Sequence, residues 1–156
     1  ARQGMKRVDI YTDGACSGNP GAGGWAAILI YNGVEKEISG YNRETTNNRM
    51  ELFAVIQGLK QLNQQCDETV YSDSAYVCNA FLEGWIDDWI AADWKLKGGK
   101  GQVKNADLWK MLLLECGRHK VKFVKVKGHA DNVHNNRCDK LATGEIAKAS
   151  KNIDTI

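Results

Sequence analysis

The stretch VDIYTDGACSGNPGAGGWAAILIYNGVEKEISGY, residues 8–41, decides the fold of this chain. Residues 8–12 are rich in strand-forming side chains and lead to Asp13-Gly14, where we expect the first strand to end. Turn residues at 17–21 precede the apolar run 25–31, and Asn32-Gly33 then indicates a two-residue hairpin that returns the chain along 34–41. The pattern predicts an antiparallel meander of three strands.

Helices and strands alternate in the rest of the chain. After the capping candidates at 45–48, apolar residues at helical spacing (52, 55, 56, 59 and 62) predict the first helix. We expect further strands at 69–73 and 121–126, and further helices opening at Ser74 and covering 105–116 and 137–149. A meander followed by such alternation implies an α/β fold with one mixed sheet flanked by helices.

Composition is that of an ordinary globular domain. Of 156 residues, 43% are hydrophobic and 26% charged, and the longest apolar run, 25–31, is far shorter than the roughly 20 residues of a membrane span. No secretory signal precedes the first strand, so we expect a cytoplasmic protein. We expect one domain over 5–150, with 1–4 as an expression remnant and 151–156 as a tail.

The five cysteines form no CxxC pair and show no metal-finger spacing. In a chain without a secretory signal, such a scattered odd number is typical of reduced thiols. We therefore expect neither a disulfide nor a zinc framework.

The net charge of +2 conceals a segregation of charges along the chain. Residues 95–127 hold ten Lys or Arg against two acids, whereas 82–94 hold four acids and no base. This arrangement predicts that one face of the protein binds a polyanion. The alternative is that these charges are only solvated surface residues.

Four carboxylates stand where strands are expected to end or helices to begin. Asp13 and Asp73 are expected at strand ends, Glu51 in the first turn of the first helix, and Asp139 at the start of the last helix. Such positions gather at one edge of a mixed sheet, although capping or solvation would explain any one of them. Clustered carboxylates repel one another, and a set of oxygen ligands favours Mg²⁺ or Mn²⁺ over zinc.

At this point the chain resembles the ribonuclease H family, bacterial HI type, over residues 5–149. The resemblance rests on six motifs in order: Tyr11–Gly14, Ser17–Gly21, Thr45–Leu52, Tyr71–Ser74, Val126–Ala130 and Asn135–Ala142. It implies a ribonuclease H-like fold with a five-stranded mixed sheet, the meander plus two parallel strands. From the single domain we expect a monomer, and from the short apolar run a protein that does not associate with membranes.

The resemblance implies endonucleolytic hydrolysis of the RNA strand of RNA–DNA hybrids with two Mg²⁺ ions, Mn²⁺ being possible, giving 5′-phosphate and 3′-hydroxyl ends. Asp13 would bridge both ions, Asp139 would hold the one that orients water, and Glu51 and Asp73 the other. The alternatives are a non-catalytic hybrid-binding module of the same fold and another nuclease on it, such as a transposase or resolvase. The complete acid set argues against the first.

Three histidines need separate interpretations. The resemblance gives His129 a role in proton transfer or product release, the alternative being a mobile surface histidine. His134 lies in the same polar loop, and His119 is interpreted as a surface residue.

The resemblance also implies substrate contacts. Asn47 and Asn48 would contact 2′-hydroxyls and backbone, with Thr46 and Asn48 seating a phosphate of the DNA strand. Asn19 would line the groove, or act only as a turn residue. Trp85 would stack on a sugar in the DNA-strand channel, while most other tryptophans are expected in the core.

Two departures from the family pattern concern substrate binding. Ala75 stands where bacterial enzymes commonly have Gln, and 90–93 are apolar and acidic where the family often has a basic cluster. Lysines at 95, 97, 100 and 104 would replace that cluster only partly. We therefore expect weaker hybrid binding with a shallower salt dependence.

Overall fold

A mixed sheet of five strands, in the order β3-β2-β1-β4-β5, organises the computed structural model. The structure describes residues 5–96, 98, 101–127 and 132–154. Its strands are β1 (Lys6–Gly18), β2 (Gly21–Tyr31), β3 (Val34–Thr45), β4 (Cys66–Ser72) and β5 (Lys120–Lys125). Its helices are α1 (Asn47–Lys60), α2 (Ala75–Leu82), α3 (Trp85–Ala91), α4 (Ala106–Arg118) and α5 (Val133–Asp154).

The predicted meander and the two parallel strands are confirmed. β1 pairs antiparallel with β2 and β2 with β3, whereas β4 pairs in parallel with both β1 and β5. The turn between β2 and β3 has φ values of 52° at Asn32 and 81° at Gly33. Positive φ at both positions is what a type I′ hairpin turn requires, which explains the Asn-Gly pair.

β1 does not end at Asp13, contrary to the prediction from the Asp-Gly pair. Its parallel pairing with β4 stops at Tyr11, but its antiparallel pairing with β2 continues to Gly18. β2 therefore holds the strand extended through the Asp-Gly pair. Asp13 lies in β1 just beyond the last residue of β1 that pairs with β4.

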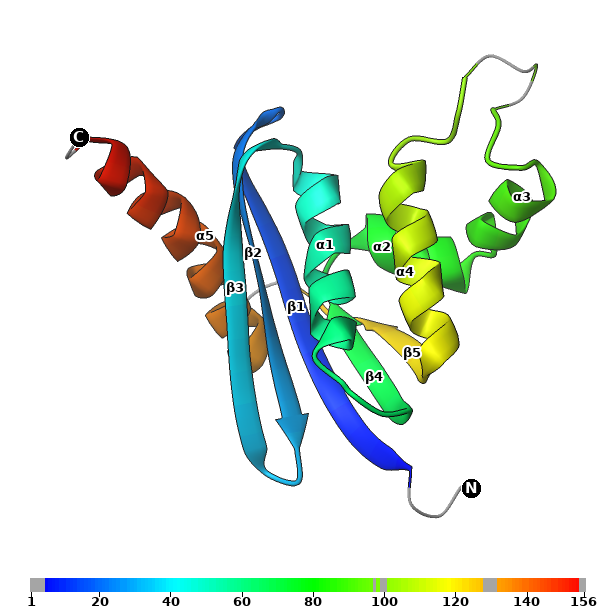
Figure 1. Cartoon of the computed structure of the whole chain (residues 1–156), viewed down its shortest axis with the longest axis horizontal. Coiled ribbons are helices and arrows are strands. Elements are labelled where there is room, and N and C mark those ends of the chain that lie inside the picture. Colours follow the sequence, from blue (N-terminus) through cyan, green and yellow to red (C-terminus); the bar gives the residue numbers. More distant parts are fainter. Residues whose placement is uncertain (1–4, 97, 99–100, 128–131, 155–156) are drawn as a thin grey trace.

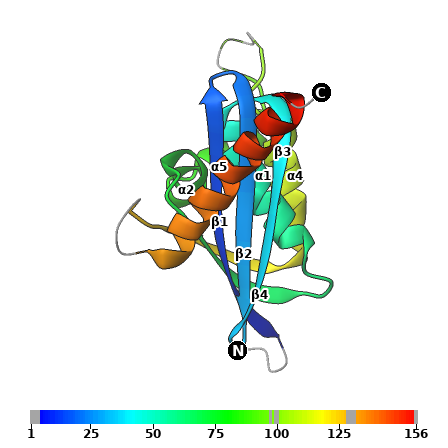
Figure 2. The ribbon, with the colours of Figure 1, turned by 90° about the vertical axis from the view of Figure 1, so that its left-hand side faces the viewer.

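Helices cover both faces of the sheet (Figures 1 and 2). Alternate residues of β2 show this division, because Ala27 and Leu29 join the core beneath α1 while Ala26 and Ile28 pack with α5 residues. The larger core also takes in α2 and α4 and includes the fully buried Trp109. Trp94 and Trp109 are buried, as predicted for most of the tryptophans.

Two acids lie further into their helices than the sequence predicts. Thr46 caps α1 by accepting a hydrogen bond from the Arg49 amide, so Glu51 lies beyond the first turn. α5 begins at Val133 rather than at residue 137, which places Asp139 well inside the helix. No helix in the described ranges is long and apolar enough to cross a membrane.

The interpretation of His119 as a surface residue is wrong. The residue is only 7% exposed, at the junction of α4 and β5. Its ring Nδ1 accepts a hydrogen bond from the amide of Cys66, 53 positions earlier in the chain. That contact depends on the parallel pairing of β4 with β5, which local sequence does not reveal.

Candidate active site

Close packing of α1 on β1 brings Glu51 next to Asp13. A Cβ atom at Gly14 would lie 2.5 Å from the backbone nitrogen of Glu51 and 2.5 Å from the carbonyl carbon of Met50. Only glycine therefore allows the two backbones to approach this closely. The residue after Asp13 thus determines how near the helix brings its carboxylate.

Three carboxylates converge at this contact. One side-chain oxygen from each of Asp13, Glu51 and Asp73 lies within 4.8 Å of the other two. They come from β1, from α1 and from the segment between β4 and α2, where the Ser72 hydroxyl accepts a hydrogen bond from the Ser74 amide. Asp13 and Glu51 are buried, and Asp73 is more accessible.

The electrostatics of the cluster are those of crowded acids. Burial, together with the charges of Asp73 and Asp139, raises the pKa of Asp13 to about 8. Asp139 is exposed on α5, and its charge influences Asp13 although its oxygens are outside the group of three that converge. Burial and then the charge of Asp13 raise the pKa of Glu51 well above its usual value.

The donor atoms of this cluster suit a hard divalent cation. All four residues offer carboxylate oxygens, the ligands that Mg²⁺ and Mn²⁺ prefer. Oε1 of Glu51 is buried and has no hydrogen-bond partner in the described part of the chain. A cation would satisfy this oxygen and reduce the mutual repulsion.

Comparisons with known proteins agree with this geometry. A family model described as RNase H matches residues 5–147. The chain belongs to the ribonuclease H family. It is 58% identical over 147 residues to the ribonuclease H of Acetivibrio thermocellus, covering 94% of this chain and 99% of that one. It is 59% identical over 144 residues to that of Thermoanaerobacter sp., covering 92% of each.

Solved structures extend the comparison to the fold. LC9-RNase H1, described as a type 1 RNase H with the type 2 active-site motif, aligns with a TM-score of 0.81 at 27% identity, over 92% of this chain and 74% of its own. LC11-RNase H1, solved in complex with an RNA/DNA hybrid, aligns with a TM-score of 0.71 at 24% identity, over 91% and 98%. Membership identifies the chain as a metal-dependent ribonuclease H.

The residues expected to contact substrate surround the start of α1 and the start of α3. The side-chain oxygen of Asn19 accepts a hydrogen bond from the backbone amide of Asn47. Asn19 therefore links the turn before β2 to the start of α1, which agrees with its interpretation as a turn residue. Asn47 is exposed and Asn48 half-buried in this ribonuclease H, and Trp85 is 37% exposed. The cap role of Thr46 is confirmed.

Of the two histidines expected in the polar loop, His129 and His134, the structure describes only His134. His129 lies within 128–131, outside the described residues. His134 stacks on Tyr11 with ring centroids 4.6 Å apart, and its Nε2 lies 3.2 Å from a carboxylate oxygen of Glu35. His134 therefore joins the start of α5 to β1 and β3.

Asn135 is a supporting residue that the sequence analysis did not single out. Its buried side-chain amide donates hydrogen bonds of 3.5 Å to the carbonyls of Thr12 and Tyr71. These carbonyls lie on β1 and β4, close to where the strands separate before Asp13 and Asp73. Only its place within the resemblance motif could have drawn attention to it.

Proposed function

We propose that this ribonuclease H hydrolyses the RNA strand of RNA–DNA hybrids endonucleolytically and leaves 5′-phosphate and 3′-hydroxyl ends. The observation that supports the proposal is the convergence of Asp13, Glu51 and Asp73, with the charge of Asp139 acting on Asp13. A protein that only binds nucleic acid gains nothing from buried acids that repel a phosphate backbone. The cluster therefore favours catalysis over the non-catalytic module.

We assign Mg²⁺ to the four carboxylates, with Mn²⁺ as a substitute. Asp13 is central to the cluster and would contact both ions, with Asp139 on one side and Glu51 and Asp73 on the other. Bound there, the ions would polarise the scissile phosphate and stabilise charge on the attacking and leaving oxygens. The cations would neutralise the charge that these residues carry when deprotonated, and we propose, from the resemblance, that His129 takes part in proton transfer.

Recognition of the hybrid would come from the rim of this cluster. Asn47 and Asn48 present amide groups next to Glu51, suited to hydrogen bonds with 2′-hydroxyls, which distinguish RNA from DNA. Trp85 offers an exposed ring for stacking on a sugar of the DNA strand. The hybrid bound to LC11-RNase H1 supports a hybrid as the substrate class.

The test is cleavage of a labelled hybrid by wild type and by Asp13→Asn, with Mg²⁺ or with chelator. We expect cleavage by wild type only, and only with Mg²⁺. Asp67→Asn, an acid at the far end of β4, is the matched control and should retain wild-type activity. Chelator-resistant cleavage, or full activity of Asp13→Asn, would refute the assignment.

A further inference from the structure

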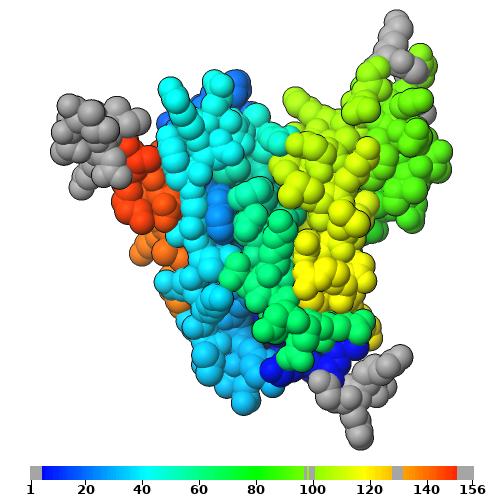
Figure 3. Space-filling model, viewed as in Figure 1, coloured from blue at the N-terminus to red at the C-terminus, as the bar shows by residue number. Residues whose placement is uncertain are grey.

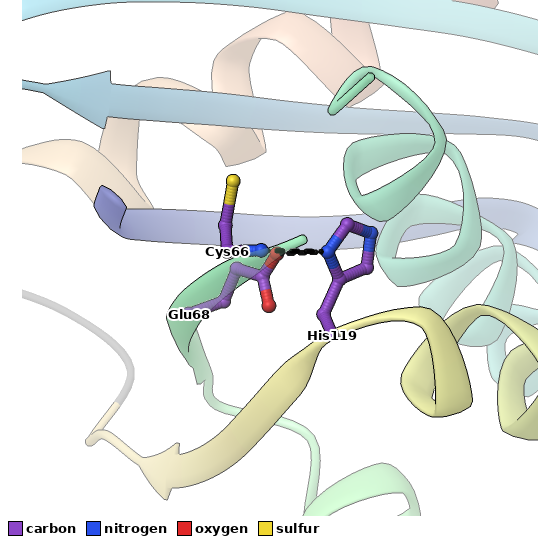
Figure 4. Close-up of side chains that lie close together, drawn as sticks. All are labelled: Cys66, Glu68 and His119. Atoms are coloured by element: carbon purple, nitrogen blue, oxygen red, sulfur yellow. Dashed lines mark hydrogen bonds and ion pairs between the residues drawn. The ribbon is translucent and has the colours of Figure 1, made fainter. Parts of the chain in front are cut away.

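Three metal-ligating side chains meet at the end of the sheet opposite the carboxylate cluster (Figure 4). Cys66 is the first residue of β4, Glu68 follows two positions later, and His119 lies between α4 and β5. One sulfur, one carboxylate oxygen and one ring nitrogen of these residues lie within 4.8 Å of one another. All three residues are buried, with exposed fractions of 2%, 0% and 7%.

The polar atoms of this group do not satisfy one another. Nδ1 of His119 accepts the amide hydrogen of Cys66 at 3.1 Å and also lies 3.0 Å from Oε1 of Glu68. If Nδ1 accepts from the amide, it has no proton to offer the carboxylate; if it donates to the carboxylate, the amide loses its acceptor. Both oxygens of Glu68 and Nε2 of His119 lack hydrogen-bond partners in the described part of the chain.

The buried carboxylate has no close cationic partner. Burial raises the pKa of Glu68 to about 8. Arg118 is the nearby cation that favours its charged form, but the Arg118 guanidinium is hydrogen-bonded to Glu115 and to the carbonyl of Leu62. Burying an ionised carboxylate is unfavourable, and a cation at this place would stabilise the ionised form of Glu68.

We propose that Cys66, Glu68 and His119 form a second, structural metal site that binds zinc. Thiolate and imidazole ligands select zinc over Mg²⁺, and sulfur, nitrogen and carboxylate oxygen are its usual protein donors. Binding releases two protons to solvent, the thiol proton of Cys66 and the carboxyl proton that Glu68 retains at neutral pH. The thiolate and carboxylate then balance the two charges of the ion while the imidazole stays neutral.

Holding the ion requires the donor atoms to move, because the nitrogen–oxygen pair must separate and the more widely spaced atoms must approach, and zinc bound to Nδ1 would replace the hydrogen bond from the Cys66 amide. Donor atoms around one tetrahedral zinc lie about 3.4–3.6 Å apart, which follows from zinc–ligand bonds of about 2.0–2.3 Å. The observed separations, 3.0 Å for the nitrogen–oxygen pair and at most 4.8 Å in the group, lie on either side of this range. Of the three residues, Cys66 also lines a cavity of about 220 Å³.

A second thiol lies near the carboxylate. Burial and then the charge of Glu68 raise the pKa of Cys116 to about 12. Cys116 is in the last turn of α4, three residues before His119, so both residues belong to the same junction. The Cys116 sulfur is outside the group of donor atoms that lie within 4.8 Å of one another, so the proposed protein ligands are three, and the site would fasten the start of β4 to the end of α4.

The experiment is a titration of the purified, reduced protein with Co²⁺, a spectroscopic substitute for zinc, in the presence of excess Mg²⁺. We expect one equivalent of Co²⁺ to produce a thiolate-to-cobalt charge-transfer band that zinc then abolishes. Cys66→Ser should lose the band, and Glu68→Gln should weaken Co²⁺ binding by about tenfold or more. Cys16→Ser, which removes a half-buried thiol near the far end of β1, is the matched control and should keep the band.

A thermal measurement checks the same site independently of the spectrum. Free zinc at about a hundred times its dissociation constant should raise the unfolding midpoint of wild type by roughly 5–10 °C. The midpoint of Cys66→Ser, whose folding is verified by circular dichroism, should not respond. Absence of the band at saturating Co²⁺, its persistence in Cys66→Ser, or displacement of the bound Co²⁺ by Mg²⁺ would overturn the proposal.

Discussion

The carboxyl group of Asp13 is buried next to Glu51, with Asp73 and Asp139 close enough to raise its pKa from 3.8 to about 8. The folded state therefore retains a proton that the unfolded chain releases above about pH 4. Stability of the cation-free protein must fall as the pH rises from about 4 to 8, and level off above that. The acids needed to bind cations thus weaken the fold when no cation is present.

Asp13→Asn should consequently be inactive but more stable than wild type in chelator. We expect a gain on the order of 3 kcal/mol near pH 9 and a much smaller one near pH 5, because wild-type Asp13 is still protonated there. Urea denaturation at both pH values measures the difference. Glu44→Gln, at an exposed position of β3, should show no such pH-dependent gain, and an equal gain of Asp13→Asn at both pH values would contradict the electrostatic cause.

Asn135 is a second single residue that supports the site, through hydrogen bonds to two backbone carbonyls and not through charge. Asn135→Ala would leave the buried carbonyls of Thr12 and Tyr71 without this donor, at a cost of about 1–3 kcal/mol. Urea denaturation should show this loss together with reduced hybrid cleavage, since β1 and β4 carry Asp13 and lead to Asp73. Asn136→Ala, at a position with no side-chain hydrogen bond in the described residues, is the control; equal losses would remove the special role of Asn135.

At the scale of elements, the approach of α1 to β1 fixes the distance between Asp13 and Glu51. Gly14→Ala would force its Cβ against the backbone of α1 at 2.5 Å. We expect a loss of stability of about 1–3 kcal/mol and a larger loss of activity, because the helix must move away together with Glu51. Chemical denaturation and hybrid cleavage together measure both effects.

Gly144→Ala is the matched substitution in a helix. A Cβ at Gly144 meets nothing within 4 Å, so Ala should stabilise α5 by about 0.5–1 kcal/mol without changing activity. If Gly14→Ala behaves like Gly144→Ala, close packing does not position Glu51.

Elements with local signals could be predicted from the sequence, and those fixed by distant partners could not. The Asn32-Gly33 turn and the caps at Thr46 and Ser74 carry their own chemistry and stand as predicted. The extension of β1 through Asp13-Gly14 depends on pairing with β2, which overrides the local turn signal. Burial of His119 depends likewise on β4 and β5 lying side by side.

The residues of the candidate site could also be predicted from the sequence only as far as local signals reach. The four carboxylates could be selected from their expected places at strand ends and helix starts, and three of them do meet. Three of those expected places were wrong, since Asp13 lies within β1, Glu51 lies beyond the first turn of α1, and Asp139 lies well inside α5. The residues still converge because helix packing on the sheet, not the strand end itself, determines the site.

At the scale of the whole molecule, the segment from α3 towards α4 projects from the body of the protein (Figure 3). Its acids Asp87, Asp88 and Asp93 are exposed, so they would repel a nucleic acid that reached this projection. The expected weak hybrid affinity and shallow salt dependence have their physical cause here.

Replacing these three acids by Lys should tighten hybrid binding by about tenfold at low salt. The slope of log affinity against log salt should steepen by about 1–3, because new phosphate contacts release counterions. Fluorescence anisotropy of an uncleavable hybrid over a salt series measures both quantities. The same change at Asp9 and Asp67 is the control, and an unchanged slope in the α3 variant would show that the projection does not meet the substrate.

We propose that the carboxylate cluster cleaves only the RNA strand of a hybrid. The decisive experiment labels each strand separately in a hybrid, an RNA duplex, a DNA duplex and single-stranded RNA, and follows cleavage with Mg²⁺. We expect products from the hybrid's RNA strand alone, each with a 5′-phosphate. Equal cleavage of single-stranded RNA, or any cleavage of the hybrid's DNA strand, would contradict it.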